Sequence, residues 1–252
     1  MIKDYGICHV AVAPLRAEAS DAAEIVTQLL FGDHVKILEK GKPWIKIYFP
    51  ADDYEGYMDF KQLLYLDENE FLESDSSAKQ VVTEGNIQVN GPLGIQNLFF
   101  GATLPNAKGK QFSIGEHTYD IMSSTPPYER SFIETAILYK NTPYLWGGKG
   151  IYGIDCSGLT QMVAKIHGIH IPRDASQQVF SGKEVKFEDR EIGDLMFFIN
   201  AKGKVHHVGI LIEKDKIIHA AGYVRIDPCD EKGIFREDFN EYTHQFHSMR
   251  RI

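Results

Sequence analysis

Cys156 lies where a glycine-rich stretch, residues 143–155, gives way to a helical pattern. The apolar residues that follow, from Leu159 to Ile166, recur with the period of a helix, so Cys156 is predicted at a junction between a loop and a first helical turn. Unpaired N–H groups and the helix dipole at such a position favour the thiolate, the nucleophilic form of cysteine. An inert, buried cysteine is the alternative.

A nucleophilic cysteine needs a base, and two predicted strands after the helix carry histidines. Residues 205–212 contain His206 and His207, and residues 216–220, reached through a short turn, contain His219. Neighbouring antiparallel strands can place His207 and His219 side by side, with the first facing Cys156 and the second holding its tautomer. Because side chains alternate along a strand, only one of His206 and His207 can face the thiol. The pattern alone leaves that choice open.

Short motifs follow one another through the second half of the chain. They are Asp-Cys-Ser-Gly at 155–158, Pro-Arg at 172–173, Gly-Asp-Leu at 193–195, His-Val-Gly-Ile at 207–210 and Ile-His-Ala at 218–220. In order and spacing this set resembles the NlpC/P60 family of cysteine peptidases. The resemblance implies that Cys156 is the nucleophile, His207 the base and His219 the orienting group, which favours His207 over His206.

The predicted elements of this region are a helix at 128–140, the Cys156 helix, and strands at 195–199, 205–212, 217–220 and 246–252. A helix-first domain followed by an antiparallel sheet belongs to the α+β class. This agrees with the papain-like fold that the resemblance implies for a catalytic domain at 128–252.

Short strands between turns precede that domain, at 6–12, 24–30, 33–39, 44–48 and 56–59, and predict a small barrel. The segments around residues 12–18 and 28–33, with Trp44 and residues 54–57, resemble the bacterial SH3-like domain that precedes some NlpC/P60 domains. We therefore expect a first SH3-like barrel at 1–70, a second, reduced SH3-like barrel at 71–122, and a linker at 123–127 that contains two prolines.

In family members with two SH3-like domains, residues near the nucleophile line the substrate groove. The resemblance assigns such roles to Tyr144, Asp155 and Ser157, and the phenol of Tyr144 could help to hold an oxyanion beside backbone N–H groups. Trp146, on the same glycine-rich approach to Cys156, is a further candidate for substrate binding. For Tyr144 and Trp146 the alternative is that they are core aromatic residues.

Three acidic or phenolic residues further from Cys156 receive a similar assignment. Asp174 corresponds to an acidic groove residue, with a helix cap before residue 175 as the alternative. Glu18 and Tyr54 of the first barrel match positions that reach the groove, and Tyr57 is the alternative to Tyr54. Acidic side chains there would bind a free α-ammonium group of the substrate.

Net charge and cysteine content limit the partners and the compartment. The formal net charge of −8 argues against nucleic acid and anionic membrane surfaces, which call for clustered Lys and Arg. Three widely spaced cysteines, Cys8, Cys156 and Cys229, suggest neither a disulfide framework nor a paired-cysteine zinc site, and we expect Cys8 and Cys229 to be packing residues. No cofactor or metal is expected, and we expect a monomer.

The first residues run directly into strand-like alternation, without a basic segment and an apolar core. No stretch approaches the roughly 18 apolar residues of a membrane span. We therefore expect a cytoplasmic protein; an exported protein whose leader has been removed is the alternative.

The resemblance implies a cysteine peptidase that cleaves the γ-D-glutamyl to L-diamino acid bond of murein-derived peptides, with a preference for a free N-terminal L-Ala. A thiol-dependent acyltransferase or amidase on the same scaffold is one alternative. Others are an endopeptidase directed to intact wall by SH3-like binding modules, and a non-catalytic wall-binding protein. A zinc site formed by Cys156, His207 and His219 is also chemically possible but would lack a fourth protein ligand.

Overall fold

The computed structural model describes residues 3–76, 79–83, 87–123 and 129–252. The chain forms two compact units, Met1–Tyr128 and Glu129–Ile252. Of the predicted linker, residues 124–127 lie outside the described residues, and Ser123 ends a strand.

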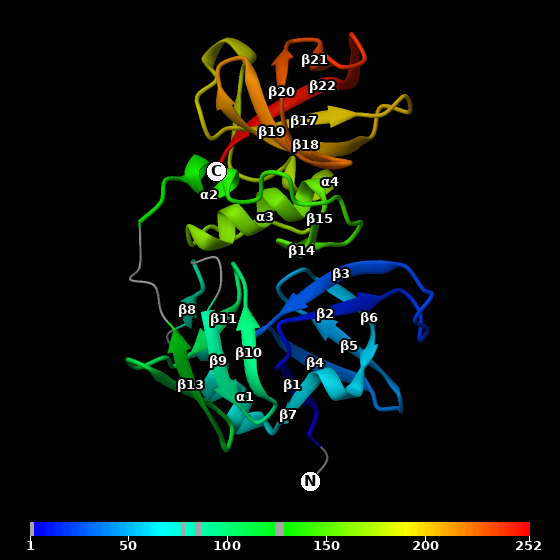
Figure 1. Ribbon diagram of the computed structural model, residues 1–252. Helices are drawn as coiled ribbons and strands as arrows, with labels where there is room; N and C mark the ends of the chain where they lie inside the picture. The colour runs from blue at the N-terminus through cyan, green and yellow to red at the C-terminus, as the bar shows by residue number, and fades with distance from the viewer. Residues whose placement is uncertain (1–2, 77–78, 84–86, 124–128) are drawn as a thin grey trace. The chain divides into compact units, whose positions relative to one another are not determined.

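The first part of unit 1 is a seven-stranded antiparallel sheet in the order β3-β2-β6-β5-β4-β1-β7 (Figure 1). Alternate residues point inward, as in β2 and β5, which is the pattern of a strand with one buried face. The strands are β1 (Tyr5–Cys8), β2 (Val12–Arg16), β3 (Ile25–Leu30), β4 (His34–Glu39), β5 (Trp44–Phe49), β6 (Tyr54–Asp59) and β7 (Leu63–Leu66), with a 3-10 turn at Phe60–Gln62 before β7.

Four of the predicted strands in this sheet, β3 to β6, are confirmed within a residue or two at their ends. The prediction of a single strand at 6–12 is wrong, because the strand is interrupted between Cys8 and Val12. β1 pairs with β4 and β7, whereas β2 pairs with β3 and β6. The two halves of the predicted strand therefore have different partners, which local alternation does not reveal.

The rest of unit 1 contains a four-stranded sheet, in the order β10-β9-β13-β12, and the pair β11-β8. The helix among them was not predicted, but the all-β character of the remainder is confirmed. The elements are α1 (Glu68–Ser76), β8 (Lys79–Val81), β9 (Ile87–Gly91), β10 (Gly94–Leu98), β11 (Thr103–Pro105), β12 (Gln111–Ile114) and β13 (His117–Ser123).

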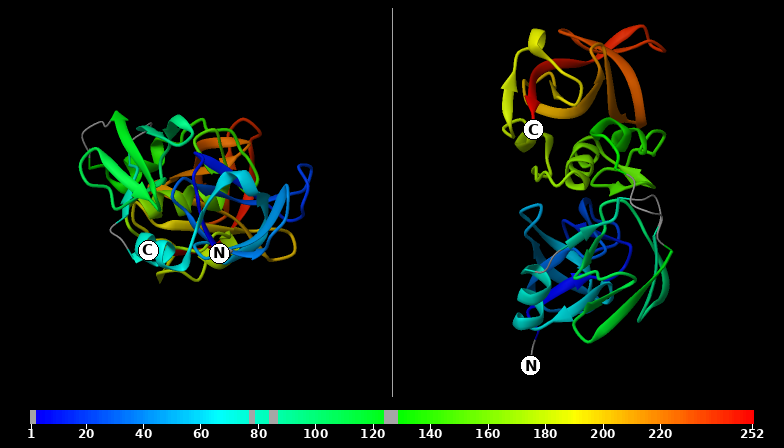
Figure 2. Two further views of the ribbon diagram at one scale, coloured as in Figure 1. Left: turned by 90° about the horizontal axis from the view of Figure 1, so that it is seen from below. Right: turned by 90° about the vertical axis from the view of Figure 1, so that its left-hand side faces the viewer.

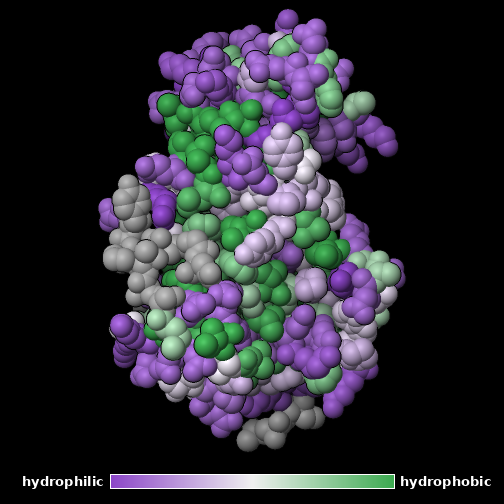
Figure 3. Space-filling view, in the orientation of Figure 1, coloured by the Kyte–Doolittle hydropathy of each residue, from purple (hydrophilic) through white to green (hydrophobic). Residues whose placement is uncertain are grey.

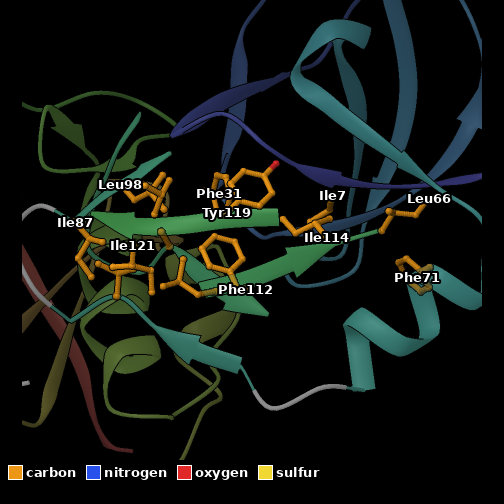
Figure 4. Close-up of a cluster of buried hydrophobic side chains, with 14 residues drawn as sticks. Ile7, Phe31, Leu66, Phe71, Ile87, Leu98, Phe112, Ile114, Tyr119 and Ile121 are labelled. Atoms are coloured by element: carbon orange, nitrogen blue, oxygen red, sulfur yellow. The ribbon is translucent and has the colours of Figure 1, made fainter. Parts of the chain in front are cut away.

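One hydrophobic core joins the two parts of unit 1. Figure 4 shows Ile7 and Phe31, from the first sheet region, in the same cluster as Phe112 and Tyr119 of the second sheet. The rings of Phe31 and Tyr119 meet edge to face with centroids 5.5 Å apart. The ranges predicted as a first and a second barrel thus share a buried core.

Unit 2 is built on a second seven-stranded sheet, in the order β16-β22-β17-β18-β19-β20-β21. Because β22 also pairs with β21, strands β17 to β22 close into a continuous antiparallel ring. The strands are β16 (Lys183–Val185), β17 (Leu195–Ile199), β18 (Val205–Glu213), β19 (Lys216–Ala221), β20 (Tyr223–Asp230), β21 (Gly233–Arg236) and β22 (Glu241–Arg251).

The helices of unit 2 lie together beside this sheet (Figures 1 and 2), and α3 packs against β18 and β19. The remaining elements are α2 (Phe132–Ile137), the short pair β14 (Lys149–Gly150) and β15 (Gly153–Ile154), α3 (Cys156–Ile166), α4 (Ala175–Gln178) and a 3-10 turn at Phe187–Asp189. The helix predicted at 128–140 is shorter than expected, because a capping box between Ser131 and Glu134 sets its start. Strands β16, β20 and β21 were not predicted. Both units consist mainly of sheet with a small helical content.

On the face drawn in Figure 3, apolar patches (green) lie among hydrophilic residues (purple). Large exposed apolar side chains include Ile95, Tyr152 and Phe180. Within the described ranges, no helix is both long and apolar enough to cross a membrane.

Candidate active site

Cys156 is the first residue of α3, as the sequence predicts. Asp155 caps the helix, and its Oδ1 accepts the N–H of Gly158 at 2.7 Å. The preceding loop passes so close to the helix that a Cβ on Gly158 would lie 2.3 Å from the carbonyl oxygen of Gly148. The glycines therefore allow the loop to hold Cys156 at the helix start.

The sulfur of Cys156 contacts the backbone of β18 at the residues before and after His207. Its Sγ is 4.0 Å from the carbonyl oxygen of His206, and the backbone N–H of Val208 donates to it. Both Cys156 and His207 are buried. The strand thus brings the candidate base next to the candidate nucleophile.

Burial governs the charge state of both groups. It raises the pKa of the Cys156 thiol to about 12, aided by the charge of Asp155 and opposed by the N–H groups of Val208 and Ser157 and by Arg173. Burial, with the neighbouring histidines, also holds the pKa of His207 well below its usual value. Burial thus opposes the preference for the thiolate that the helix start predicts.

His207 and His219 lie side by side, as the strand pattern predicts. β18 and β19 are antiparallel with Gly209 opposite His219, and His207 Nε2 is 2.8 Å from His219 Nδ1. His206 is exposed, because alternation turns it to the other face of β18. Of the two adjacent histidines, only His207 is in hydrogen-bond contact with His219.

Two residues near these histidines were missed in the sequence. Asp227 Oδ2 lies 2.9 Å from His219 Nε2, and its Oδ1 accepts a hydrogen bond of 2.6 Å from Arg225. The ring of His244 packs on His207, with centroids 4.2 Å apart. Both belong to strands whose pairing is distant in sequence, although the spacing of Arg225 and Asp227 by two residues is the period of a strand face.

A buried ion pair holds the loop before the nucleophile. Arg173 is 1% exposed and bonds the carboxylate of Asp155 through both terminal nitrogens, at 2.9 and 2.5 Å. It also donates to Ser157 Oγ at 2.9 Å, and Gly147 N–H donates to Asp155 at 2.8 Å. Asp155 and Ser157 thus have structural contacts beside the nucleophile, and direct contact with substrate stays a prediction. The Pro-Arg motif was the sequence signal for Arg173, but no role was assigned to it.

The other predicted groove residues of unit 2 differ in their settings. Burial and the nearby charges of Cys156 and Asp155 raise the pKa of the Tyr144 phenol, which places this group near the nucleophile. Trp146 is 61% exposed, so the core alternative does not describe it. Asp174 is the N-cap residue of α4, as the capping alternative proposed.

Glu18 and Tyr54 belong to unit 1. Glu18 is exposed just after β2, and Tyr54 begins β6 and packs against the core of the first sheet. Their contact with the groove stays a prediction, as does the choice between Tyr54 and Tyr57.

In the part of the chain that the structure describes, no three His, Cys, Asp or Glu side chains are arranged to hold a metal ion. All three cysteines are free and buried. Cys8 and Cys229 pack in hydrophobic clusters, as predicted.

Comparison with known proteins places these features in a family. The profile of the NlpC/P60 family matches residues 141–243, and that of the bacterial dipeptidyl-peptidase Sh3 domain matches residues 15–63. A gamma-D-glutamyl-L-lysine dipeptidyl-peptidase from Bacillus cereus is 31% identical over 248 residues, which cover 86% of this chain and 74% of that protein. One of the same name from Bacillus subtilis is 28% identical, covering 78% and 72%.

The fold agrees with these matches. The crystal structure of an NlpC/P60 family protein from Bacillus cereus has a TM-score of 0.80 at 22% identity and covers 98% of this chain and 99% of its own. The described part of unit 2 combines this fold with a cysteine at a helix start and two buried, hydrogen-bonded histidines. The chain therefore belongs to the NlpC/P60 family of cysteine peptidases.

Proposed function

We propose that this peptidase hydrolyses the bond between γ-D-glutamate and an L-diamino acid in murein-derived peptides, and that it prefers peptides with a free N-terminal L-Ala. The observation that carries the proposal is that Cys156 Sγ contacts the backbone of β18 at the residues before and after His207, and that the ring of His207 bonds to His219. The bond cleaved follows from the two relatives named gamma-D-glutamyl-L-lysine dipeptidyl-peptidase.

In the acylation step, Cys156 Sγ attacks the γ-carbonyl carbon while its proton passes to the imidazole of His207. Because burial raises the pKa of Cys156 and lowers that of His207, the proton moves as the sulfur attacks. Backbone N–H groups at the start of α3, with the Tyr144 hydroxyl, stabilise the oxyanion. The C–N bond then breaks, and His207 protonates the leaving amine.

In the deacylation step, His207 removes a proton from water, and the resulting hydroxide attacks the thioester. The C–S bond breaks, the proton returns to the sulfur, and the γ-glutamyl acid leaves. His219 orients His207 in both steps. No metal ion takes part in this sequence.

Specificity for a free N-terminus rests on the first barrel in this proposal. The match to the bacterial dipeptidyl-peptidase Sh3 domain, residues 15–63, includes both Glu18 and Tyr54. An exposed carboxylate such as Glu18 gains most from a charged amine when the substrate covers it. Asp174, Trp146, Asp155 and Ser157 complete the substrate-binding set in unit 2.

We further propose that residues 71–122 form a reduced second SH3-like barrel that packs on the first through their shared core.

Three free cysteines and an acidic net charge support a monomer that acts on soluble peptides in the cytoplasm. Size-exclusion chromatography with light scattering tests the monomer.

Mass spectrometry of products from a panel of muropeptides tests the function. The panel contains L-Ala-γ-D-Glu-L-Lys, its diaminopimelate counterpart, their N-acetylated forms and intact sacculi. We expect release of the L-Ala-γ-D-Glu dipeptide from the free peptides and poor cleavage of the others. Cys156→Ala should be inactive, whereas Cys8→Ala and Cys229→Ala serve as controls that stay within a few-fold of wild type. Equal cleavage of free peptide, acetylated peptide and sacculi would contradict the specificity, and transfer of the acyl group to an added amine would favour the acyltransferase.

A further inference from the structure

A line of hydrogen bonds runs from the candidate base across the sheet. His207 Nε2 is 2.8 Å from His219 Nδ1, His219 Nε2 is 2.9 Å from Asp227 Oδ2, and Asp227 Oδ1 accepts from Arg225 at 2.6 Å. The members come from three neighbouring strands, β18, β19 and β20. His207, His219 and Asp227 are each at most 5% exposed, so water does not compete freely for these contacts.

Asp227 fixes which ring nitrogens of His219 and His207 carry a proton. Arg225 and His219 both hydrogen-bond to Asp227 and lower its pKa, so that it is a carboxylate, which only accepts hydrogen bonds. His219 must therefore carry its proton on Nε2. Because a neutral His219 then has a lone pair on Nδ1, the proton between the two histidines belongs to His207 Nε2.

We propose that Asp227 is a positioning residue that sets the tautomer of both histidines, so that Nδ1 of His207 is the nitrogen that accepts the proton of Cys156. The proposal rests on the proposed function for the role of His207, and it adds the atom that acts as base and the residue that selects it. Without an obligatory acceptor facing His219 Nε2, the two histidines could adopt the opposite tautomers. His207 would then carry a proton on Nδ1, and this nitrogen could not accept the proton of Cys156.

The groups around the line favour a neutral His219. Burial lowers its pKa, and the cations Arg225 and Arg236 lower it further, whereas Asp227 raises it. His207 faces it from β18, and the ring of His244, on β22, lies 5.7 Å away. The pKa of His244 is itself lowered to about 4, mainly by burial, so this ring is neutral near pH 7.

A second salt bridge anchors the surroundings of Asp227. Arg225 also approaches Asp238 at 3.6 Å, and Asp238 pairs with Arg236 at 2.5 Å. Arg225 therefore presents donors that require an oxygen at the Asp227 Oδ1 position. This requirement makes the isosteric amide an informative substitution.

In Asp227→Asn, Arg225 should hold the amide oxygen, which leaves the NH₂ group facing His219 Nε2. That donor forces the proton of His219 onto Nδ1, and His207 then carries its proton on Nδ1. In Asp227→Ala, the space left admits water, which can accept the Nε2 proton, so the active tautomer stays populated. A merely structural role predicts the reverse order, because Ala removes more contacts than Asn.

The test combines kinetics on muropeptide with ¹⁵N NMR of the histidine side chains in the full chain, which distinguishes Nδ1–H from Nε2–H tautomers. In the wild type, His207 and His219 should both be Nε2–H, and in Asp227→Asn both should be Nδ1–H. We expect kcat to fall by about 10²–10⁴-fold in Asp227→Asn with little change in KM, and by about 10-fold in Asp227→Ala. Asp230→Asn, on the same strand and bonded to Tyr242, is the matched control and should resemble the wild type.

A wild-type protein with His207 protonated on Nδ1, or unchanged tautomers in Asp227→Asn, would overturn the proposal, as would a larger kcat loss in Asp227→Ala than in Asp227→Asn. The wild-type spectrum decides the matter even if a variant does not fold. Failure of the proposed function has a different signature: the wild type would leave the muropeptide intact while the tautomers are as expected.

Discussion

The guanidinium of Arg173 and the carboxylate of Asp155, the residue before Cys156, form a bidentate ion pair that is almost completely buried. The same carboxylate caps α3 and accepts the N–H of Gly147. One ion pair therefore joins the loop before Cys156, the first turn of α3 and the loop that carries Arg173. Any substitution that removes one of the two charges and leaves the other without its partner should disturb both the fold and the site.

Arg173→Met should lower the free energy of unfolding by about 3–5 kcal/mol, because it leaves the Asp155 carboxylate buried without its partner. Denaturant unfolding measures this change. Lys216→Met is the matched control, since it breaks the exposed pair with Glu213 and should change the free energy of unfolding far less. Similar costs for the two substitutions would show that the buried pair does not stabilise the loop.

His207→Ala should reduce kcat more than His219→Ala, because the first removes the base and the second only its orienting partner. Loss of a positioned base typically costs about 10²–10⁴-fold. Exposed His206 should tolerate alanine with little loss, and it serves as the control from the same strand. Steady-state kinetics of the three variants would reject the assignment if His206→Ala were inactive and His207→Ala active.

The acidic limb of kcat/KM should lie below pH 6.5. In the proposed mechanism the base is the neutral form of His207, and burial, together with the neighbouring His219 and His244, holds the pKa of His207 well below 6.5. A lowered pKa means that the imidazole stays unprotonated as the pH falls through 6.5, so activity is retained there and lost only at lower pH. A pH profile, with circular dichroism at each pH to confirm folding, measures this. A limb above 6.5 would contradict it.

Glu18→Gln should lower kcat/KM for free L-Ala-γ-D-Glu-diamino acid peptides by about 10–150-fold, the range expected for one charged hydrogen bond. N-acetylation of the peptide should do at least as much harm to the wild type. Because the acetylated peptide lacks the ammonium, Glu18→Gln should have little further effect on its cleavage. Glu24→Gln, which changes the acidic residue directly before β3, is the control. If Glu18→Gln affected free and acetylated peptides alike, Glu18 would not bind the ammonium.

Local patterns in the sequence determined the parts of the site that depend on near neighbours. The change from glycine-rich loop to helical period predicted Cys156 at the start of α3, and alternation on β18 separated His206 from His207. These features follow from the geometry of a single helix or strand, so they are visible without the rest of the fold. The resemblance then identified His207 as the base, and the structure shows it bonded to His219.

Only the tertiary structure brought Asp227 and His244 to the histidines. Their strands, β20 and β22, reach the site through pairing around the closed sheet, and no local pattern states which strands will be neighbours. Burial likewise opposes the expected preference of Cys156 for the thiolate, because desolvation depends on everything packed around the sulfur, whereas the helix dipole depends on one helix. Sequence thus determined the candidate reactive groups, and the packing of distant strands decided their partners and their burial.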